Sequence, residues 1–318
     1  MTRVAAIDCG TNSIRLLVAD ADPATGELTE LDRRMTIVRL GQGVDRTGRL
    51  APEALERTFA ACREYAEVVE RHGASERLRF VATSASRDAE NRDEFVRGVV
   101  DILGVEPEVI TGDQEAELSF TGATKELTGR DDLRRPFLVV DIGGGSTEFV
   151  VGDDHVRAAR SVDVGCVRMT ERHLVRDGAV TDPPTGEQIA AMRADVEAAL
   201  DRAEETVPLR DARTLVGLAG SVTTVSAIAQ DLPEYDSAAI HHSRVSRDRV
   251  REITEWLLRS THAERAAVPS MHSGRVDVIG AGALVLLAIM ERTGAEEVVV
   301  SEHDILDGIA WSCASEAR

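Results

Sequence analysis

The feature of this 318-residue sequence that most constrains its fold is a short segment that occurs twice. Near its start the chain reads AAIDCGTNSIRLLVAD, and later it reads LVVDIGGGSTEFVVGD. The two segments align without a gap at an offset of 133 residues (141 minus 8), which places Asp8 on Asp141, Gly10 on Gly143 and Ser13 on Ser146. Each copy has the pattern of a strand, an acidic turn with glycine and a second strand. Two copies with the same strand–turn–strand pattern predict a duplicated fold with two facing hairpins.

Hydrophobic periodicity and turn residues predict the other elements of each half. The first half is predicted to contain strands 3–9, 13–20, 28–39, 78–83 and 106–110, and helices 52–72, 91–103 and 113–127. The second half again begins with three strands. It is predicted to contain strands 137–141, 147–152, 155–163, 213–218 and 297–301, and helices 166–175, 186–206, 222–230, 246–258, 272–293 and 303–315. The crossing between the halves is placed at 129–135.

Composition limits the classes of function. A net charge of −19 and an aromatic content of 3% argue against a nucleic-acid partner, and the charge argues against an anionic membrane. The four cysteines are scattered without a C-x-x-C pair, and the histidines lack zinc-ligand spacing. The longest nearly apolar run, Val278–Met290, is shorter than the ~20 residues of a membrane-spanning helix. These features predict a soluble, cytoplasmic protein, and a homodimer is left open.

The second turn has the composition of a phosphate-binding loop. Gly143, Gly144 and Gly145 can adopt positive φ and leave their N–H groups uncovered, and Ser146 and Thr147 add hydroxyl donors. A tight hairpin without a ligand is the alternative, and the matching upstream copy argues against it.

Two carboxylates, Asp141 and Glu148, flank this turn. Mg²⁺ is bound in proteins by one or two carboxylates together with substrate phosphates. The second turn therefore predicts a phosphate site with Mg²⁺ as cofactor.

Seven stretches, in chain order, resemble the exopolyphosphatase/guanosine pentaphosphatase family: AIDCGTNSIRLLV, VRLGQGVDRTGRL, VATSASRDAENRDEF, VITGDQEAELSFTGA, DIGGGSTEF, SVDVGCVRMTERHL and RVDVIGAGALVLL…VVVSEHDILDGIAW. The resemblance covers nearly the whole chain. It implies an α/β fold of two ribonuclease-H-like domains of the actin/hexokinase/heat-shock ATPase superfamily with an interdomain cleft. The expected domains are 1–128, joined by the C-terminal helix 302–318, and 129–301. The chain looks like a short member, without the C-terminal helical extension of longer members.

The resemblance also implies roles for individual residues. Glu115 matches the catalytic base, and Asp141 and Glu148 match metal-site residues. The position before the base is often acidic in the family, and Gln114 stands there, which we interpret as a change of the nearby charge.

The first hairpin and a later loop complete this set. Asp8 is expected to face the metal waters, and Thr11, Asn12 and Ser13 the phosphate oxygens. The family usually has Ser where Thr11 stands, and the added methyl group is expected to tighten the loop. Arg87 is expected to bind a phosphate beyond the terminal one, because a guanidinium can contact two oxygens.

Four features keep two interpretations. Arg15 either reaches the site or lies at the surface, and Arg168 is a second candidate for phosphate. Gly217, Gly220 and Ser221 resemble the superfamily's nucleotide-binding turn, but helix capping explains them equally well. The segment HHSRVSRDRVREI contains several arginines interleaved with acids, which favours a solvated helix face over a polyanion track.

These observations favour an enzyme that releases terminal orthophosphate from inorganic polyphosphate with Mg²⁺. Guanosine pentaphosphate (pppGpp) is the alternative substrate. A superfamily kinase or a non-hydrolysing nucleotide sensor is less favoured, because no sugar-kinase motif is found and a match to the base is present.

Overall fold

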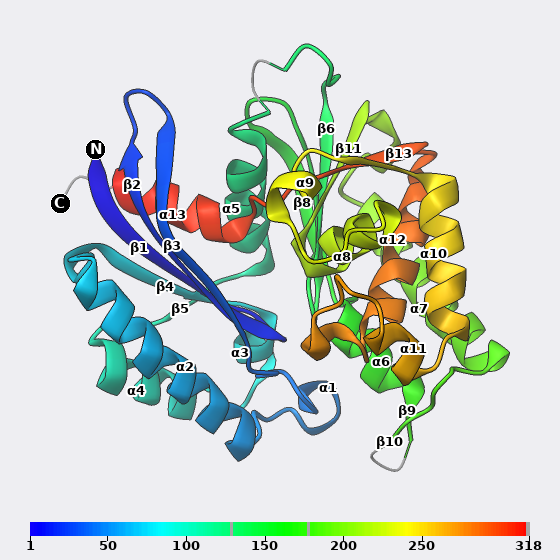
Figure 1. Cartoon of the computed structure of the whole chain (residues 1–318), viewed down its shortest axis with the longest axis horizontal. Coiled ribbons are helices and arrows are strands. Elements are labelled where there is room, and N and C mark those ends of the chain that lie inside the picture. The colour runs from blue at the N-terminus through cyan, green and yellow to red at the C-terminus, as the bar shows by residue number, and fades with distance from the viewer. Residues whose placement is uncertain (128–129, 177–178, 316–318) are drawn as a thin grey trace. The chain divides into compact units, whose positions relative to one another are not determined.

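The computed structural model describes residues 1–127, 130–176 and 179–315 (Figure 1). The chain divides into two compact units, Met1–Glu126 with Asp304–Arg318, and Leu127–His303. We call them unit 1 and unit 2. The predicted domain border between residues 128 and 129 lies outside the described residues.

Unit 1 is built on a five-stranded sheet in the order β3-β2-β1-β4-β5. Its strands are β1 (Thr2–Cys9), β2 (Ser13–Asp22), β3 (Glu27–Ile37), β4 (Leu78–Ala82) and β5 (Glu108–Val109). Its helices are α1 (Val44–Thr47), α2 (Pro52–Arg71), α3 (Ser84–Asp88), α4 (Arg92–Leu103), α5 (Gly112–Thr124) and α13 (Ile305–Ser315), with a 3-10 turn η1 at Ser75–Arg77.

Alternation along β1 separates the two cores of unit 1. Ile7 packs with Phe80 and Phe95 in the cluster that contains residues of α2 and α4. Val4 and Ala6 pack on the other face, in the cluster that contains residues of α13. The sheet is therefore covered on both faces.

Two glycines allow α5 and α13 to cross closely. A Cβ on Gly122 would lie 1.8 Å from the carbonyl oxygen of Asp304, and a Cβ on Gly308 would lie 2.1 Å from that of Leu118. The missing side chains let the two backbones touch. This crossing fixes the start of α13 beside the helix that carries Glu115.

Unit 2 contains a six-stranded sheet in the order β12-β13-β11-β6-β7-β8. Its strands are β6 (Phe137–Ile142), β7 (Thr147–Gly152), β8 (Val156–Val162), β11 (Thr214–Leu218), β12 (Arg244–Ser246) and β13 (Glu297–Val300), with a separate β9–β10 pair (Val175–Arg176, Ala179–Val180). Its helices are α6 (Cys166–Leu174), α7 (Gly186–Glu204), α8 (Ala219–Ala229), α9 (Ser237–Ile240), α10 (Arg247–Arg259), α11 (His262–Ala266) and α12 (Ile279–Thr293), with 3-10 turns η2 (Leu209–Asp211) and η3 (Ser273–Arg275). The buried helix α12 contacts α6, α7, α8 and α10.

The two sheets confirm the predicted duplication. Strands β8-β7-β6-β11-β13 repeat the order β3-β2-β1-β4-β5, with an antiparallel meander followed by parallel strands in each case. The turns also match: Gly10 N–H donates to Ser13 O at 3.0 Å, and Gly143 N–H donates to Ser146 O at 3.1 Å. The antiparallel strand β12 at the edge of unit 2 was not predicted.

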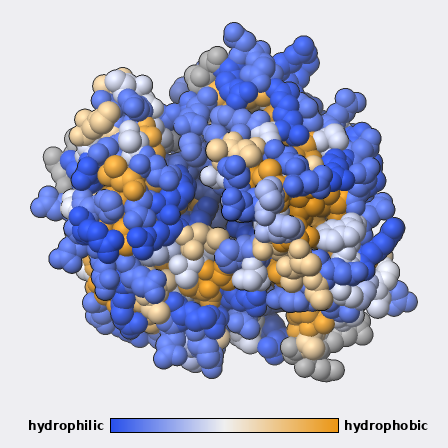
Figure 2. Space-filling model, viewed as in Figure 1, coloured by the Kyte–Doolittle hydropathy of each residue, from blue (hydrophilic) through white to orange (hydrophobic). Residues whose placement is uncertain are grey.

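The predicted helix 272–293 is wrong at its start. Residues Ser273–Arg275 form a 3-10 turn, and the α-helix begins only at Ile279. Within the described ranges, no helix is long and apolar enough to cross a membrane. Hydrophilic residues predominate on the face drawn in Figure 2, with small hydrophobic areas between them.

Candidate active site

The backbone at the tip of the first hairpin presents N–H groups outward. Gly41 N–H donates to Thr11 O at 2.9 Å, and the amides of Val38 and Arg39 donate to Asn12 O at 3.0 and 2.8 Å. The carbonyl groups of Thr11 and Asn12 thus accept hydrogen bonds from the segment that follows β3. In the part of the chain that the structure describes, the N–H groups of Thr11 and Asn12 have no acceptor. Such successive amides form an anion-binding concavity.

The second hairpin has a similar arrangement, in which the bonded carbonyls lie one position earlier in the alignment. Cys166 N–H donates to Gly143 O at 3.0 Å, and the amides of Val167 and Arg168 donate to Gly144 O at 2.9 and 3.0 Å. The N–H groups of Gly144 and Gly145 have no acceptor among the residues described. These two positions align with Thr11 and Asn12, so each unit carries the same open pair of amides.

The predicted reason for the three glycines is wrong in one respect. Positive φ among the described glycines occurs at other positions and not at 143–145. The turn is instead crowded: a Cβ on Gly165 would lie 2.6 Å from the carbonyl carbon and oxygen of Gly144. Glycine is needed at position 165 for this close approach of two backbones, which brings the start of α6 against the turn.

The hydroxyl groups near this turn have different surroundings. Thr147 is fully buried, and its hydroxyl donates to Val164 O at 2.6 Å. Its single proton is therefore used within the hairpin, and phosphate binding by this hydroxyl stays a prediction. Ser146 is also buried, and Ser13 and Asn12 are half-buried at the first tip.

Asp8 belongs to a buried ion-pair chain. Arg15 donates to Asp8 Oδ2 from Nη2 at 2.7 Å and from Nε at 3.0 Å, and it also binds Asp304 Oδ2. Burial raises the pKa of Asp8, although Arg15 opposes this effect. Burial alone would also raise the pKa of Asp304, but Arg15 holds it below its ordinary value. Of the two interpretations of Arg15, the surface one is therefore wrong.

One atom of this chain lacks a partner. Asp8 Oδ1 is buried and makes no hydrogen bond among the described residues, while Oδ2 is bound by Arg15. A buried carboxylate oxygen without a donor is costly unless a cation or water reaches it. Asp8 thus keeps one oxygen suited to an ion or its water shell.

Asp141 and Glu148 are direct partners across the second hairpin. Their side chains are 7% and 1% exposed, and Ser161 Oγ donates to Glu148 Oε1 at 2.7 Å. In the aligned pair of the first hairpin, the partner of Asp8 is Arg15. The second hairpin therefore places two acids where the first has an acid and a base. Hard oxygen donors of this kind suit Mg²⁺.

Glu115 is held at the start of α5. The N-cap Thr111 and Gln114 form a capping box, in which Gln114 Oε1 accepts from Thr111 N–H at 2.9 Å. Gln114 therefore acts as a helix cap, a role that Glu fills equally well, so its amide need not be explained by charge tuning. Glu115 lies in the first turn after this cap, so the cap fixes the position of its side chain. Glu115 is 8% exposed.

Arg87 contacts the predicted base. Its Nη1 lies 3.2 Å from Glu115 Oε2 and donates to Ile110 O at 3.0 Å. These bonds fix one edge of the guanidinium and orient the carboxylate. Nε and Nη2 have no acceptor within the described part of the chain, so they remain available to an anion.

Thr11 is packed more tightly than the family's usual serine would be. Its hydroxyl lies 2.8 Å from Ser84 Oγ, so the hydroxyl function is kept. Its methyl group fills the space above Gly41, where an added Cβ would lie 2.3 Å from Thr11 Cγ2. This contact agrees with the expected tightening of the loop.

The turn at Gly217–Ser221 is occupied by an arginine. A Cβ on Gly220 would lie 1.1 Å from Arg275 Nη1, and one on Gly217 would lie 2.7 Å from Val222. The N-cap of α8 is Leu218, so capping does not explain Ser221. Sequence reasoning missed Arg275 because it follows Gly220 by 55 residues (275 minus 220) and has no local pattern.

The structure also gives the partners of Arg168 and of the arginines in the segment after His242. Arg168 Nε donates to Gly145 O at 2.6 Å, so this side chain braces the second turn. In the segment after His242, Arg244 binds Glu297, Arg249 binds Glu252 and Arg251 binds Asp248. These ion pairs favour the solvated-face interpretation.

Comparisons with known proteins agree with this geometry. A model of the Ppx/GppA phosphatase family matches residues 17–316. The chain is 54% identical to Exopolyphosphatase 2 of Mycobacterium tuberculosis over 99% of each protein. It is 29% identical to the guanosine-5'-triphosphate,3'-diphosphate pyrophosphatase of Aeromonas salmonicida, over 96% of this chain and 58% of that protein.

Solved structures show the same likeness. The crystal structure of an exopolyphosphatase-like protein has a TM-score of 0.91 and 46% identity, covering 98% of both chains. The Ppx/GppA family member of Aquifex aeolicus has a TM-score of 0.78 and 29% identity, covering 100% of this chain and 99% of that one. With the repeated strand order, these likenesses confirm the predicted α/β fold with a duplicated sheet, as found in Ppx/GppA proteins.

Proposed function

The chain belongs to the Ppx/GppA phosphatase family, and on that basis we propose that it is an exopolyphosphatase that releases terminal orthophosphate from inorganic polyphosphate. The observation that carries the proposal is the pair of matching hairpin tips, each with two outward amides at equivalent positions. Bare amides recognise phosphate oxygens without reading any other chemical group. The 54% identity to Exopolyphosphatase 2 supports the same substrate class.

Glu115 is the residue we assign as general base. It accepts a proton from the attacking water while the water oxygen forms a bond to the terminal phosphorus and the bridging P–O bond breaks. The products are orthophosphate and a chain one phosphate shorter, whose new terminal oxygen keeps the bonding electrons. Arg87 keeps the Glu115 carboxylate in place and offers its remaining N–H groups to a phosphate oxygen.

Mg²⁺ is the cofactor that the carboxylates fit. Asp141 and Glu148 would hold it. When bound, the ion supplies positive charge that offsets the phosphate oxygens. The chain's own carboxylates supply the hard oxygen donors, and Ser161 keeps Glu148 oriented.

Inorganic polyphosphate is ranked above pppGpp because of Arg275. Its guanidinium covers Gly220, in the turn that resembles a nucleotide-binding turn of the superfamily. An arginine there favours a further phosphate over a nucleoside, since its side chain is positively charged and occupies the volume. The relative from Aeromonas salmonicida keeps pppGpp as the second candidate.

The test is a comparison of kcat/KM for polyphosphates of several lengths and for pppGpp at one Mg²⁺ concentration and ionic strength. We expect higher values for polyphosphate, and we expect Arg275→Ala to raise the ratio of the pppGpp value to the polyphosphate value. A pppGpp value above that of every polyphosphate would reverse the ranking. No phosphate release from any of these substrates would refute the proposal.

We also propose that the protein acts in the cytoplasm. All four cysteines are buried thiols, as suits a reducing compartment.

A further inference from the structure

Unit 2 carries a concentration of arginine far from its phosphate turn. A groove of about 810 Å³ is lined by Arg134, Arg135, Pro136, Arg157, Arg210, Asp211 and Arg213. Five of the seven residues are arginine and one is acidic, in a chain whose net charge is −19. Such a local excess of positive charge is an electrostatic footprint for an anionic ligand. We call this set of seven residues the arginine groove.

The ion pairs within the groove leave two guanidinium groups open. Arg135 is bound to Asp154 at 2.6 Å, Arg157 is bound to Asp153, and Arg210 lies 3.7 Å from Glu204. Arg134 and Arg213, in contrast, have no side-chain partner in the part of the chain that the structure describes. Both are exposed.

The backbone beneath these two arginines is fixed. Thr214 Oγ1 donates to Arg134 O at 2.7 Å and accepts from Arg134 N–H at 3.1 Å, while Arg213 N–H donates to Pro136 O at 2.8 Å. Thr214, directly after Arg213, pairs in register with Phe137, which lies three residues after Arg134, between β11 and β6. The two free cations are therefore presented from neighbouring strand ends, with little backbone entropy left to lose on binding.

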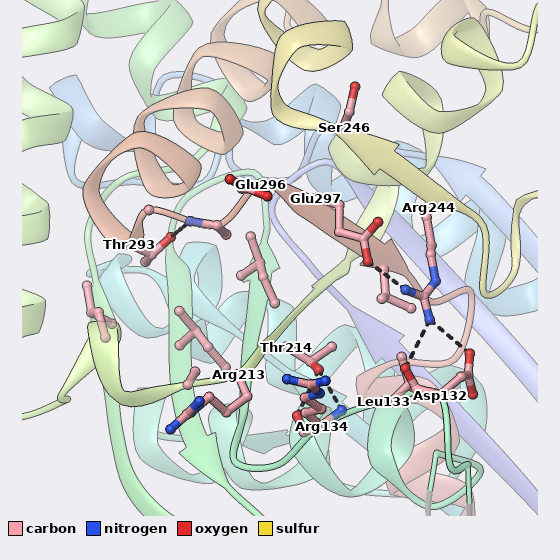
Figure 3. A pocket seen from close by; sticks show the side chains of 17 residues that line it. Asp132, Leu133, Arg134, Arg213, Thr214, Arg244, Ser246, Thr293, Glu296 and Glu297 are labelled. Carbon is pink, nitrogen blue, oxygen red and sulfur yellow. Dashed lines mark hydrogen bonds and ion pairs between the residues drawn. The ribbon is translucent and has the colours of Figure 1, made fainter.

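The neighbouring cavity contains an arginine whose charge is neutralised by acidic partners (Figure 3). There the guanidinium of Arg244 binds Asp132 at 2.9 Å and Glu297 at 2.6 Å. Arg134 and Arg213 line the same cavity without such partners. The guanidinium groups without an acidic partner are thus those of Arg134 and Arg213, whereas Arg244 engages two acids of the cavity, Asp132 and Glu297.

The groove and the phosphate turn lie at opposite ends of strand β6. Arg134, Arg135 and Arg213 precede the amino ends of β6 and β11, whereas Gly143–Ser146 follows the carboxyl end of β6. The six residues of β6 separate the two ends by about 20 Å, at ~3.3 Å per residue. A short substrate on the turn cannot reach the groove, but a long one can.

We propose that the arginine groove is a second binding site for inorganic polyphosphate, which holds the distant part of long chains. This inference rests on the proposed function for its ligand. Regularly spaced phosphates match a row of forked donors, and no aromatic side chain lines the groove to stack on a base. Its role is affinity for long chains, and the chemistry stays at the hairpins.

The test compares Arg134→Ala/Arg213→Ala with Arg202→Ala/Arg259→Ala, a control that removes the same charge from exposed positions of unit 2. Binding of labelled long-chain polyphosphate is measured in EDTA, without turnover. KM and kcat are then measured for long chains and for tripolyphosphate. Arg134→Lys/Arg213→Lys serves as the conservative variant.

We expect the alanine variant to bind long chains roughly tenfold more weakly, equivalent to about 1.4 kcal/mol. Its KM should rise for long chains only, while its kcat and its KM for tripolyphosphate stay unchanged. The lysine variant should retain most of the affinity. Equal weakening in the control, wild-type binding by the alanine variant, or equally good competition by polyglutamate would overturn the inference.

The two proposals fail separately. If the wild type releases no phosphate from either substrate, the proposed function fails while the EDTA binding experiment still decides the groove. If the wild type is active and both double alanine variants bind and turn over long chains alike, only the groove inference fails.

Discussion

Asp8 and Arg15 face each other across the first hairpin, with Arg15 Nη2 2.7 Å from Asp8 Oδ2. The same register position in the second hairpin joins Asp141 to Glu148. The duplication has therefore kept the backbone and changed the charge of one partner. The first hairpin is balanced internally by Arg15, whereas the acids of the second are suited to an external cation.

This asymmetry predicts where Mg²⁺ dependence resides. Asp141→Asn and Glu148→Gln should each raise the Mg²⁺ concentration needed for half-maximal activity, because each removes a charged oxygen donor. The measurement is a Mg²⁺ titration of phosphate release from polyphosphate. Glu187→Gln, an exposed acid of the same unit, is the control. Curves for both hairpin variants that overlay the wild-type curve would contradict the assignment.

Glu115→Gln tests the proposed base. Glutamine can still accept from Arg87, so the start of α5 should remain folded, but it cannot take the proton of the attacking water. We expect kcat to fall by roughly 10²–10⁴-fold, the usual contribution of a general base, with Mg²⁺-dependent binding unchanged. Glu117→Gln, an exposed position on the same helix, should keep its kcat. Near-wild-type kcat in Glu115→Gln would remove this residue from the mechanism.

The sequence predicted the fold well because strands and helices follow from patterns of neighbouring residues, and because one motif occurs twice. The repeat around Asp8 and Asp141 indicated two meanders, and most of the longer strands and helices had a periodicity of their own. Side-chain partners were harder to predict, because they depend on distant residues. Nothing near Gly220 indicates that Arg275 covers it, and nothing near Arg15 indicates Asp304. The acceptor of the Thr147 hydroxyl was missed for the same reason, since it lies on the loop after β8.

Two buried acidic groups of unit 1 predict loss of stability in alkali. Burial raises the pKa of the Cys62 thiol to about 12, and burial likewise raises the pKa of the Tyr65 hydroxyl to about 12. A folded-state pKa above the unfolded value stabilises the fold fully below the unfolded pKa and less as the pH rises. The free energy of unfolding should therefore fall between about pH 9 and pH 12, by about 1.4 kcal/mol per pH unit for each group once it is ionised in the unfolded chain.

Urea unfolding at a series of pH values measures this slope. Cys62→Ala should reduce it from about pH 9 upward, and Tyr65→Phe only above about pH 10, the ordinary pKa of tyrosine. Identical slopes in the wild type and both variants would show that these groups ionise without unfolding.

The contact between Thr11 and Gly41 predicts coupling between two substitutions at the first hairpin. Gly41→Ala would place a Cβ 2.3 Å from Thr11 Cγ2, and overpacking of this kind costs about 1–3 kcal/mol. It should also lower kcat/KM, because Gly41 N–H holds the Thr11 carbonyl and so aims the tip amides. Thr11→Ser removes the clashing methyl group and keeps a hydroxyl for Ser84. The double variant should therefore lose less than the two single variants combined.

Urea unfolding and kcat/KM for tripolyphosphate complete this cycle. Gly186→Ala is the control, because an added Cβ there meets nothing within 4 Å and should change neither quantity. A coupling energy of about 0.5–3 kcal/mol is typical for residues in contact. Strictly additive losses would mean that the clash is relieved by movement of the segment after β3, and that the methyl group of Thr11 does not set the position of the phosphate-binding amides.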